Sequence, residues 1–134
     1  MYLLDTDTVV FLLRGNEPVR RNLELHRLAP IRISAVTLME LYYGAFKSGR
    51  PEANVARVHA VERAAEILPI EREAAEVFGM LKASLEKAGT PLDDFDLAIA
   101  ACALTNKLVL VTHNTRHFQR VTGLVLEDWT QAGG

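Results

Sequence analysis

The sequence predicts an α/β fold in which a parallel five-stranded sheet is flanked by helices on both faces. Short apolar runs alternate with longer amphipathic segments along all 134 residues, a pattern typical of parallel strands joined by helical crossovers. Residues 108–111 are apolar at every position, as expected for a strand that is buried on both faces of a parallel sheet. The crossovers are expected to be right-handed.

Five short segments are expected to form the strands. Each is rich in apolar residues, and breaks such as Ala29-Pro30 precede them. The last of them is expected to lie at an edge of the sheet. The predicted strands cover residues 2–5, 31–34, 67–70, 108–111 and 124–126.

Helices are expected to fill the intervals between these strands. Gly15-Asn16 ends the first helix, which Thr6 or Asp7 can cap, and Pro18 suits the first turn of the second. Gly49-Arg50-Pro51 and Gly89-Thr90-Pro91 are turns that separate later helices. The predicted helices cover residues 6–14, 17–28, 34–45, 52–65, 71–88 and 94–106, with a turn or short helix at 114–118.

The length and composition indicate one globular domain. We expect it to cover residues 1–131, with residues 132–134 as a frayed tail. Hydrophobic residues make up 49% of the chain and charged residues 24%, an ordinary balance for a soluble protein. Because no apolar run approaches the roughly 20 residues that a membrane span needs, and no signal-peptide pattern is present, we expect a cytoplasmic protein without a membrane partner.

The charge and the cysteine content exclude some functions. A net charge of −2 argues against a protein that coats nucleic acid by bulk attraction. It does not exclude a nuclease, because a bound cation would offset acidic residues in its site. Cys102 is the only cysteine, so the chain can form neither an intramolecular disulfide nor a thiolate metal cluster.

Four acidic residues that are far apart in the chain follow predicted strands or begin helices. Asp5 ends the first strand, Glu40 lies in the helix after the second, and Asp94 and Asp96 open an almost wholly apolar helix. Because an open α/β sheet gathers such positions at the carboxyl ends of its strands, we expect these side chains to meet. Carboxylates that are packed together repel one another unless a cation neutralises them. Their placement predicts a metal-dependent phosphoryl-transfer site.

The donor set predicts which cation binds and how. Oxygen ligands without cysteine select hard ions, here Mg²⁺ or Mn²⁺. We expect Asp5 and Asp96 to contact the ion directly and Glu40 to contact it through water. Asp94 is either a further ligand or a helix cap. The hydroxyl groups of Thr6, Ser34 and Thr112 can hydrogen-bond the carboxylates or a phosphate.

Five blocks of sequence resemble those of PIN-domain ribonucleases, and specifically the VapC toxins of the type II VapBC toxin–antitoxin family. They are Tyr-Leu-Leu-Asp-Thr at 2–6, Ile-Ser-Ala-Val-Thr-Leu-Met-Glu-Leu-Tyr-Tyr-Gly-Ala at 33–45, Gly-Thr-Pro-Leu-Asp-Asp-Phe-Asp-Leu-Ala-Ile-Ala-Ala at 89–101, Leu-Val-Thr-His-Asn-Thr-Arg-His-Phe at 110–118 and Gly-Leu-Val-Leu-Glu-Asp-Trp at 123–129.

The resemblance implies a single PIN-like domain with Mg²⁺ or Mn²⁺ in an acidic cleft. It implies endonucleolytic cleavage of RNA, with initiator tRNA as a family-level expectation. It also implies a homodimer, inhibition by a VapB-like antitoxin whose tail occupies the cleft, and contact with DNA only through that antitoxin.

The resemblance also implies roles for individual residues. Asp5, Glu40 and Asp96 match the family's acidic triad. Asn114 occupies a fourth, often acidic position, which weakens a second metal site and leaves open whether one or two ions bind. The chain departs from the common pattern at Asp7, where most relatives have Asn, and at 93–95, where Asp-Asp-Phe replaces a Gly-Pro-Tyr-like stretch.

Three alternatives remain open. A housekeeping RNA-processing PIN nuclease would share the same site. A PIN fold that only binds a partner would not need three acids in its cleft. A haloacid-dehalogenase-like phosphatase would use Asp5 as its nucleophile and Asp7 as its acid. The phosphatase would also need a later acidic pair after an apolar strand, whereas Asp93-Asp94 follows a Gly-Thr-Pro turn.

Overall fold

The computed structural model describes residues 1–26 and 30–131 of the chain. Its strands are all parallel, and each is short. Three of them pair in the order β1-β4-β5, and two pair as β2-β3. Their bounds are β1 (Tyr2–Leu4), β2 (Ile31–Ser34), β3 (Ala65–Leu68), β4 (Val109–Val111) and β5 (Leu126–Glu127).

The expectation of one continuous five-stranded sheet was therefore only partly right. The parallel pairing is confirmed for the described residues, whereas the strand count of the sheet is only partly matched. No ladder joins β1 to β2, although the two strands lie side by side. Strands of three or four residues have few backbone groups with which to pair, so a small separation removes the whole ladder.

The helices agree with the predicted order. The prediction placed the third strand two residues too late, because α4 ends at Ala64 and the chain enters β3 directly, with Ala65 paired to Ile31. The last strand lies slightly later than predicted. The expected tail at 132–134 and the end of the predicted helix 17–28 fall outside the described residues. The helices are α1 (Thr6–Leu13), α2 (Glu17–Leu25), α3 (Ala35–Lys47), α4 (Pro51–Ala64), α5 (Arg72–Lys87), α6 (Asp94–Thr105) and α7 (Thr115–Phe118).

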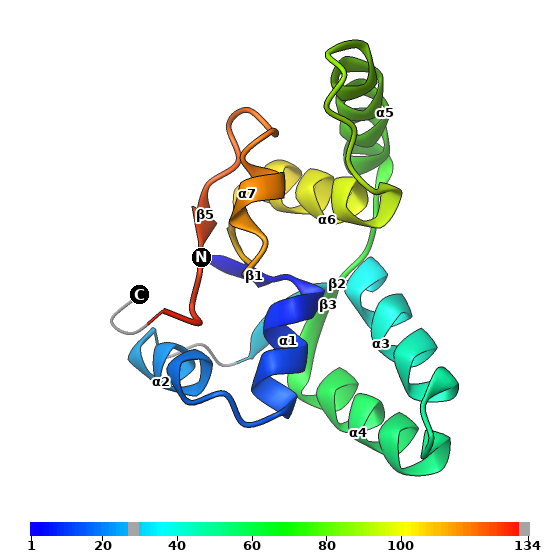
Figure 1. Ribbon diagram of the computed structural model, residues 1–134, viewed down its shortest axis with the longest axis vertical. Coiled ribbons are helices and arrows are strands. Elements are labelled where there is room, and N and C mark those ends of the chain that lie inside the picture. The colour runs from blue at the N-terminus through cyan, green and yellow to red at the C-terminus, as the bar shows by residue number, and fades with distance from the viewer. Residues whose placement is uncertain (27–29, 132–134) are drawn as a thin grey trace.

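Two hydrophobic cores lie on opposite faces of the strands. Leu3 and Leu110 are fully buried against α5, α6 and α7, whereas the next residues along each strand, Leu4 and Val111, are fully buried against α1 to α4. This alternation follows from the two-residue period of a strand. Figure 1 shows α5 to α7 on one side of the strands and α1 to α4 on the other. The predicted coverage of both faces is confirmed.

The carboxyl ends of the strands lead directly into helices. Asp5 follows β1 and caps α1, accepting a hydrogen bond from Thr6 N at 2.8 Å. Ser34 ends β2 and caps α3, and its Oγ accepts from Thr37 N at 3.1 Å. Thr112 follows β4 and is completely buried. Three strand ends thus bring polar residues to one edge of the fold. No described helix is both long and apolar enough to cross a membrane.

Alanine substitutions at two glycines in and after α5 are expected to change the free energy of unfolding in opposite directions. Gly79 lies inside α5 on an exposed surface, and a Cβ there meets no atom within 4 Å. Gly89 follows the helix with φ of +76°. We expect Gly79→Ala to raise the free energy of unfolding by about 0.5–1 kcal/mol, and Gly89→Ala to lower it by about 1 kcal/mol, since side chains disfavour positive φ. Denaturant unfolding of both variants measures these changes, and equal signs would contradict the assigned end of α5.

Candidate metal-dependent active site

An acidic cleft opens at the carboxyl ends of β1 and β4. It has a volume of about 390 Å³. The side chains around it come from the end of β1, the length of α1 and its C-cap, the middle of α3, the first turn of α6 and the loop before α7. Its lining residues are Asp5, Thr6, Asp7, Val10, Phe11, Arg14, Glu40, Asp96 and Asn114. The structure brings Asp5, Glu40 and Asp96 to this one cleft.

Asp5 is the most buried carboxylate of the cleft, with 5% of its surface exposed. Its Oδ1 accepts from Thr6 N at 2.8 Å, and its Oδ2 accepts from Thr112 Oγ1 at 2.7 Å. Burial and the charge of Asp7 raise the pKa of Asp5 to about 7, although both hydrogen bonds lower it. The fold therefore holds this side chain in one orientation. Its ionised form is destabilised by burial and by Asp7, and a bound cation would stabilise it.

Asp7 also turns into the cleft. Its Oδ2 accepts from the backbone N–H of His113 at 3.1 Å, and its Oδ1 accepts from Thr8 Oγ1 at 3.2 Å. Burial raises the pKa of Asp7, against the opposing effect of these hydrogen bonds. The sequence alone marked Asp7 as an added charge, a cap or, in the phosphatase alternative, the acid. The structure shows that it links α1 to the loop after β4.

Glu40 reaches the cleft from α3 and is fixed by neighbouring hydroxyl groups. Thr6 Oγ1 donates to Glu40 Oε1 at 2.7 Å and lies 3.0 Å from Thr37 Oγ1. Thr37 is fully buried. Its contribution was missed because the sequence contains many threonines, and only the folded chain brings this one beside Thr6.

Asp96 and Asn114 also line the cleft. Asp96 is half-buried in the first turn of α6. Burial, followed by the charges of Asp93 and Glu40, raises its pKa to about 6. The backbone N–H of Asn114 donates to Thr112 Oγ1 at 3.0 Å. Because Thr112 Oγ1 also donates to Asp5, it connects the Asn114 loop to the most buried carboxylate.

Asp94 does not line the cleft. Its carboxylate pairs with Lys82 Nζ at 2.9 Å, and its side chain is 59% exposed. Asp93 caps α6 by accepting from Phe95 N at 3.1 Å. Asp96 therefore lines the cleft, whereas its neighbours Asp93 and Asp94 do not. A helix rotates successive side chains by about 100°, so Asp94 and Asp96 leave α6 in different directions.

The cleft residues fit a hard divalent cation by their chemistry. They supply carboxylate oxygens from Asp5, Asp7, Glu40 and Asp96, the ligand type that Mg²⁺ and Mn²⁺ prefer. In the part of the chain that the structure describes, no three His, Cys, Asp or Glu side chains converge on one point. Carboxylates that repel one another are expected to spread apart in this way, and each raised pKa reports that repulsion together with burial.

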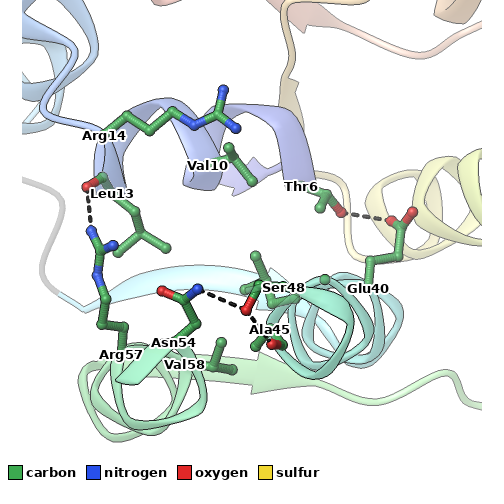
Figure 2. A pocket seen from close by; sticks show the side chains of 12 residues that line it. Thr6, Val10, Leu13, Arg14, Glu40, Ala45, Ser48, Asn54, Arg57 and Val58 are labelled. Carbon is green, nitrogen blue, oxygen red and sulfur yellow. Dashed lines mark hydrogen bonds between the residues drawn. The ribbon is translucent and has the colours of Figure 1, made fainter. Parts of the chain in front are cut away.

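A second hollow continues from the cleft between α1, α3 and α4 (Figure 2). It has a volume of about 370 Å³ and shares Thr6, Val10, Arg14 and Glu40 with the cleft. Sequence reasoning did not place Arg14 in the cleft. Its position seven residues after Asp7 is the signal that could have found it, since residues two helical turns apart share a face. We call this second hollow the α1–α4 groove.

Comparison with known proteins places the chain in a family. The PIN domain family matches residues 2–124. The tRNA(fMet)-specific endonuclease VapC of Salmonella typhimurium is 41% identical over 129 residues, which cover 96% of this chain and 97% of the relative.

Solved structures agree with this assignment. The crystal structure of DNA-bound VapBC from Salmonella typhimurium contains a chain that is 40% identical, with a TM-score of 0.88 and coverage of 96% of this chain and 97% of that one. VapBC2 from Rickettsia felis, bound to a DNA fragment from its promoter, contains a chain that is 32% identical, with a TM-score of 0.87 and coverage of 96% and 98%. This protein belongs to the PIN-domain family and, within it, to the VapC ribonucleases.

Proposed function

We propose that this chain is a divalent-cation-dependent endoribonuclease and the toxin of a toxin–antitoxin module. The observation that carries the proposal is the cleft in which Asp5, Asp7, Glu40 and Asp96 gather, two of them with a pKa raised to about 7 and about 6. Perturbed carboxylates that share a cleft indicate a functional site. The VapC relatives supply the reaction class.

Asp5 and Asp96 would hold the cation directly, and Glu40 would contact it through water. When bound, a divalent cation activates water and neutralises charge on a phosphodiester during in-line attack. The chain's own contribution is orientation. Thr112 and Thr6 N fix the Asp5 carboxylate, and the Thr6 hydroxyl fixes Glu40. The uncharged Asn114 faces the same cleft, and its side-chain amide can donate to a phosphate oxygen.

The partners follow from the relatives. The VapBC structures contain an antitoxin together with the toxin, and two of them contain DNA. We propose a VapB-like antitoxin for this chain and DNA contact through that antitoxin. A homodimer is proposed from the family resemblance alone. The name of the Salmonella relative specifies tRNA(fMet), which makes initiator tRNA the first substrate to test here.

The test is cleavage of initiator tRNA and of a mixed cellular RNA pool by the purified protein. We expect discrete cuts with Mg²⁺ or Mn²⁺, and a loss of more than about 100-fold in rate with a chelator, because the carboxylates alone cannot neutralise the charge that develops on the phosphate. Undiminished cutting in chelator would contradict cation dependence. The absence of cutting with either ion, in a folded protein, would contradict the nuclease assignment.

The remaining alternatives are separated by other readouts. Growth arrest on expression, relieved by the product of a neighbouring antitoxin gene, distinguishes a toxin from a housekeeping nuclease. The phosphatase alternative predicts hydrolysis of a small phosphomonoester with a covalent phosphate on Asp5. The PIN-family match argues against it, as does the exposed pair that Asp94 makes with Lys82.

A further inference from the structure

The α1–α4 groove adjoins the acidic cleft, because Thr6, Val10, Arg14 and Glu40 line both hollows. Apolar side chains of α1, α3 and α4 form most of its wall. Figure 2 shows Thr6 and Glu40 at the cleft end and Arg57 and Asn54 at the far end. A strand that passes its reactive phosphate through the cleft has this groove as a path for the next nucleotides. The apolar wall consists of Val10, Leu13, Leu41, Ala45 and Val58.

Arg14 is the one cationic side chain among the described residues that line the acidic cleft. It follows α1 as its C-cap and is exposed. In Figure 2 its side chain runs back along the helix, so that the guanidinium lies beside Val10. Arg57, by contrast, is engaged with the chain itself, and its Nη2 donates to Leu13 O at 2.7 Å. Within the described part of the chain Arg14 makes no ion pair.

The charges along this path are complementary to an RNA strand. The scissile phosphate would lie among carboxylates whose charge the bound metal ion neutralises. The neighbouring phosphate would lie away from that ion, where a positively charged side chain can stabilise it. The nine residue-to-residue steps from Asp5 to Arg14 span about 13 Å of helix, and the arginine side chain reaches back over part of this distance. A guanidinium at that place can bind a phosphate oxygen through two N–H groups.

The groove can also accommodate a base. Its volume of about 370 Å³ falls in the range of small-ligand pockets. Asn54 Nδ2 donates to Ser48 Oγ at 2.9 Å, and Ser48 Oγ donates to Ala45 O at 2.6 Å. These bonds orient the Asn54 amide, whose oxygen has no hydrogen-bond partner in the described residues, and an oriented amide can accept from the edge of a base.

We propose that Arg14 binds the RNA phosphate next to the scissile one and directs the strand into the α1–α4 groove, where the flanking base packs. This inference rests on the proposed ribonuclease function. It makes Arg14 a positioning residue for the substrate and the groove a subsite for sequence preference. A protein segment in the groove is the competing occupant, and the experiments below separate the two.

The first test is binding of a short single-stranded RNA oligonucleotide, measured over a range of salt concentrations in an Asp96→Asn background that prevents cutting. We expect Arg14→Ala to weaken binding about tenfold and to reduce the slope of log K against log[salt] by about 0.7, the value for one lost phosphate contact on a single strand. Arg14→Lys should keep the slope. The control is Lys87→Ala, which removes an exposed charge from the end of α5, far from the groove (Figure 1), and should change neither quantity.

The second test blocks the path without changing charge. Gly44 lines the groove, and a Cβ at this position meets no atom within 4 Å. Gly44→Leu should fill the groove and lower cleavage of initiator tRNA, or of the RNA that the wild type cuts, about tenfold. Gly79→Leu is the matched control, since Gly79 is also a helical glycine with open space around it, and it should leave cleavage unchanged.

The outcomes separate this inference from the proposed function. If the wild type cuts no RNA, the proposed function fails, and the salt dependence of binding still tests Arg14. If the wild type cuts RNA while Arg14→Ala and Gly44→Leu bind and cut normally, the inference is overturned, and the groove is left as a protein-docking surface. A loss in Arg14→Ala that Lys87→Ala reproduces would also overturn it, because the effect would then be bulk charge.

Discussion

Asp5→Asn is expected to lower RNA cleavage by more than about 100-fold and at the same time to stabilise the fold at alkaline pH. The loss of activity follows from removing the most buried carboxylate ligand of the proposed metal site. The gain in stability follows from the pKa of about 7 that burial and Asp7 impose on this carboxyl. A change that inactivates an enzyme while stabilising it indicates a site built at a cost in stability.

The size of the stability gain can be bounded. A pKa of about 7 instead of 3.8 means that ionising Asp5 in the folded protein costs about 4 kcal/mol. Asparagine has nearly the same shape and avoids this cost, but its amide group complements the Thr112 hydroxyl less well than a carboxylate oxygen does, a loss of about 1–2 kcal/mol. We therefore expect the free energy of unfolding at pH 8 to rise by about 2 kcal/mol.

The measurement is paired. Two quantities are compared for the wild type, Asp5→Asn and Asp94→Asn. The first is the cleavage rate at a fixed cation concentration, and the second is the free energy of denaturant unfolding at pH 8 without cation. Asp94→Asn carries the same chemical change on the exposed surface beside Lys82 and should alter neither quantity much. Retained cleavage in Asp5→Asn would contradict the assignment of Asp5 to the metal site. A strong loss in Asp94→Asn would restore Asp94 as a ligand.

The second large effect is a fall in stability as the pH rises from 5 to 8 in the presence of a chelator. The folded protein keeps protons on Asp96 and Asp5 up to about pH 6 and about pH 7, whereas in the unfolded chain both lose them near the ordinary value of 3.8. The unfolded state thus binds fewer protons between these limits, so the free energy of unfolding decreases with pH. We expect Tm to fall on the order of 10 °C.

A divalent cation should reverse this fall. An ion at 100 times its Kd stabilises the folded state by about 2.7 kcal/mol, which again corresponds to a shift in Tm on the order of 10 °C. The stabilisation should be large at pH 8 and small at pH 5, where protons occupy the carboxylates that the ion would contact.

Differential scanning calorimetry with Mg²⁺, with Mn²⁺ and with chelator at both pH values measures this effect. The control is the double variant Asp5→Asn with Asp96→Asn, in which both the pH dependence and the response to the cation should be much smaller. An equal response to the cation in the double variant would place the ion elsewhere. A Tm that rises between pH 5 and pH 8 in chelator would contradict the raised pKa values of Asp5 and Asp96.

The sequence alone was sufficient for the order and class of the elements and for the expectation that acidic residues remote in the chain meet in one cleft. Strands and helices are encoded by local periodicity and by local breaks such as Ala29-Pro30. That these acids meet could be predicted because each stands at a strand end or in the first two turns of a helix, and an α/β sheet brings such positions to one edge. The choice of Asp5, Glu40 and Asp96 over Asp94 came from the family resemblance.

Only the tertiary structure decided which neighbouring side chains join the triad. Asp7 and Arg14 line the cleft, whereas Asp94 turns away to Lys82. Thr37 supports Thr6 from another helix, 31 residues further along the chain. The separation of the β2-β3 ladder from β1 was decided there as well. These outcomes depend on the relative rotation and distance of elements that are remote in sequence, quantities that a local pattern does not contain.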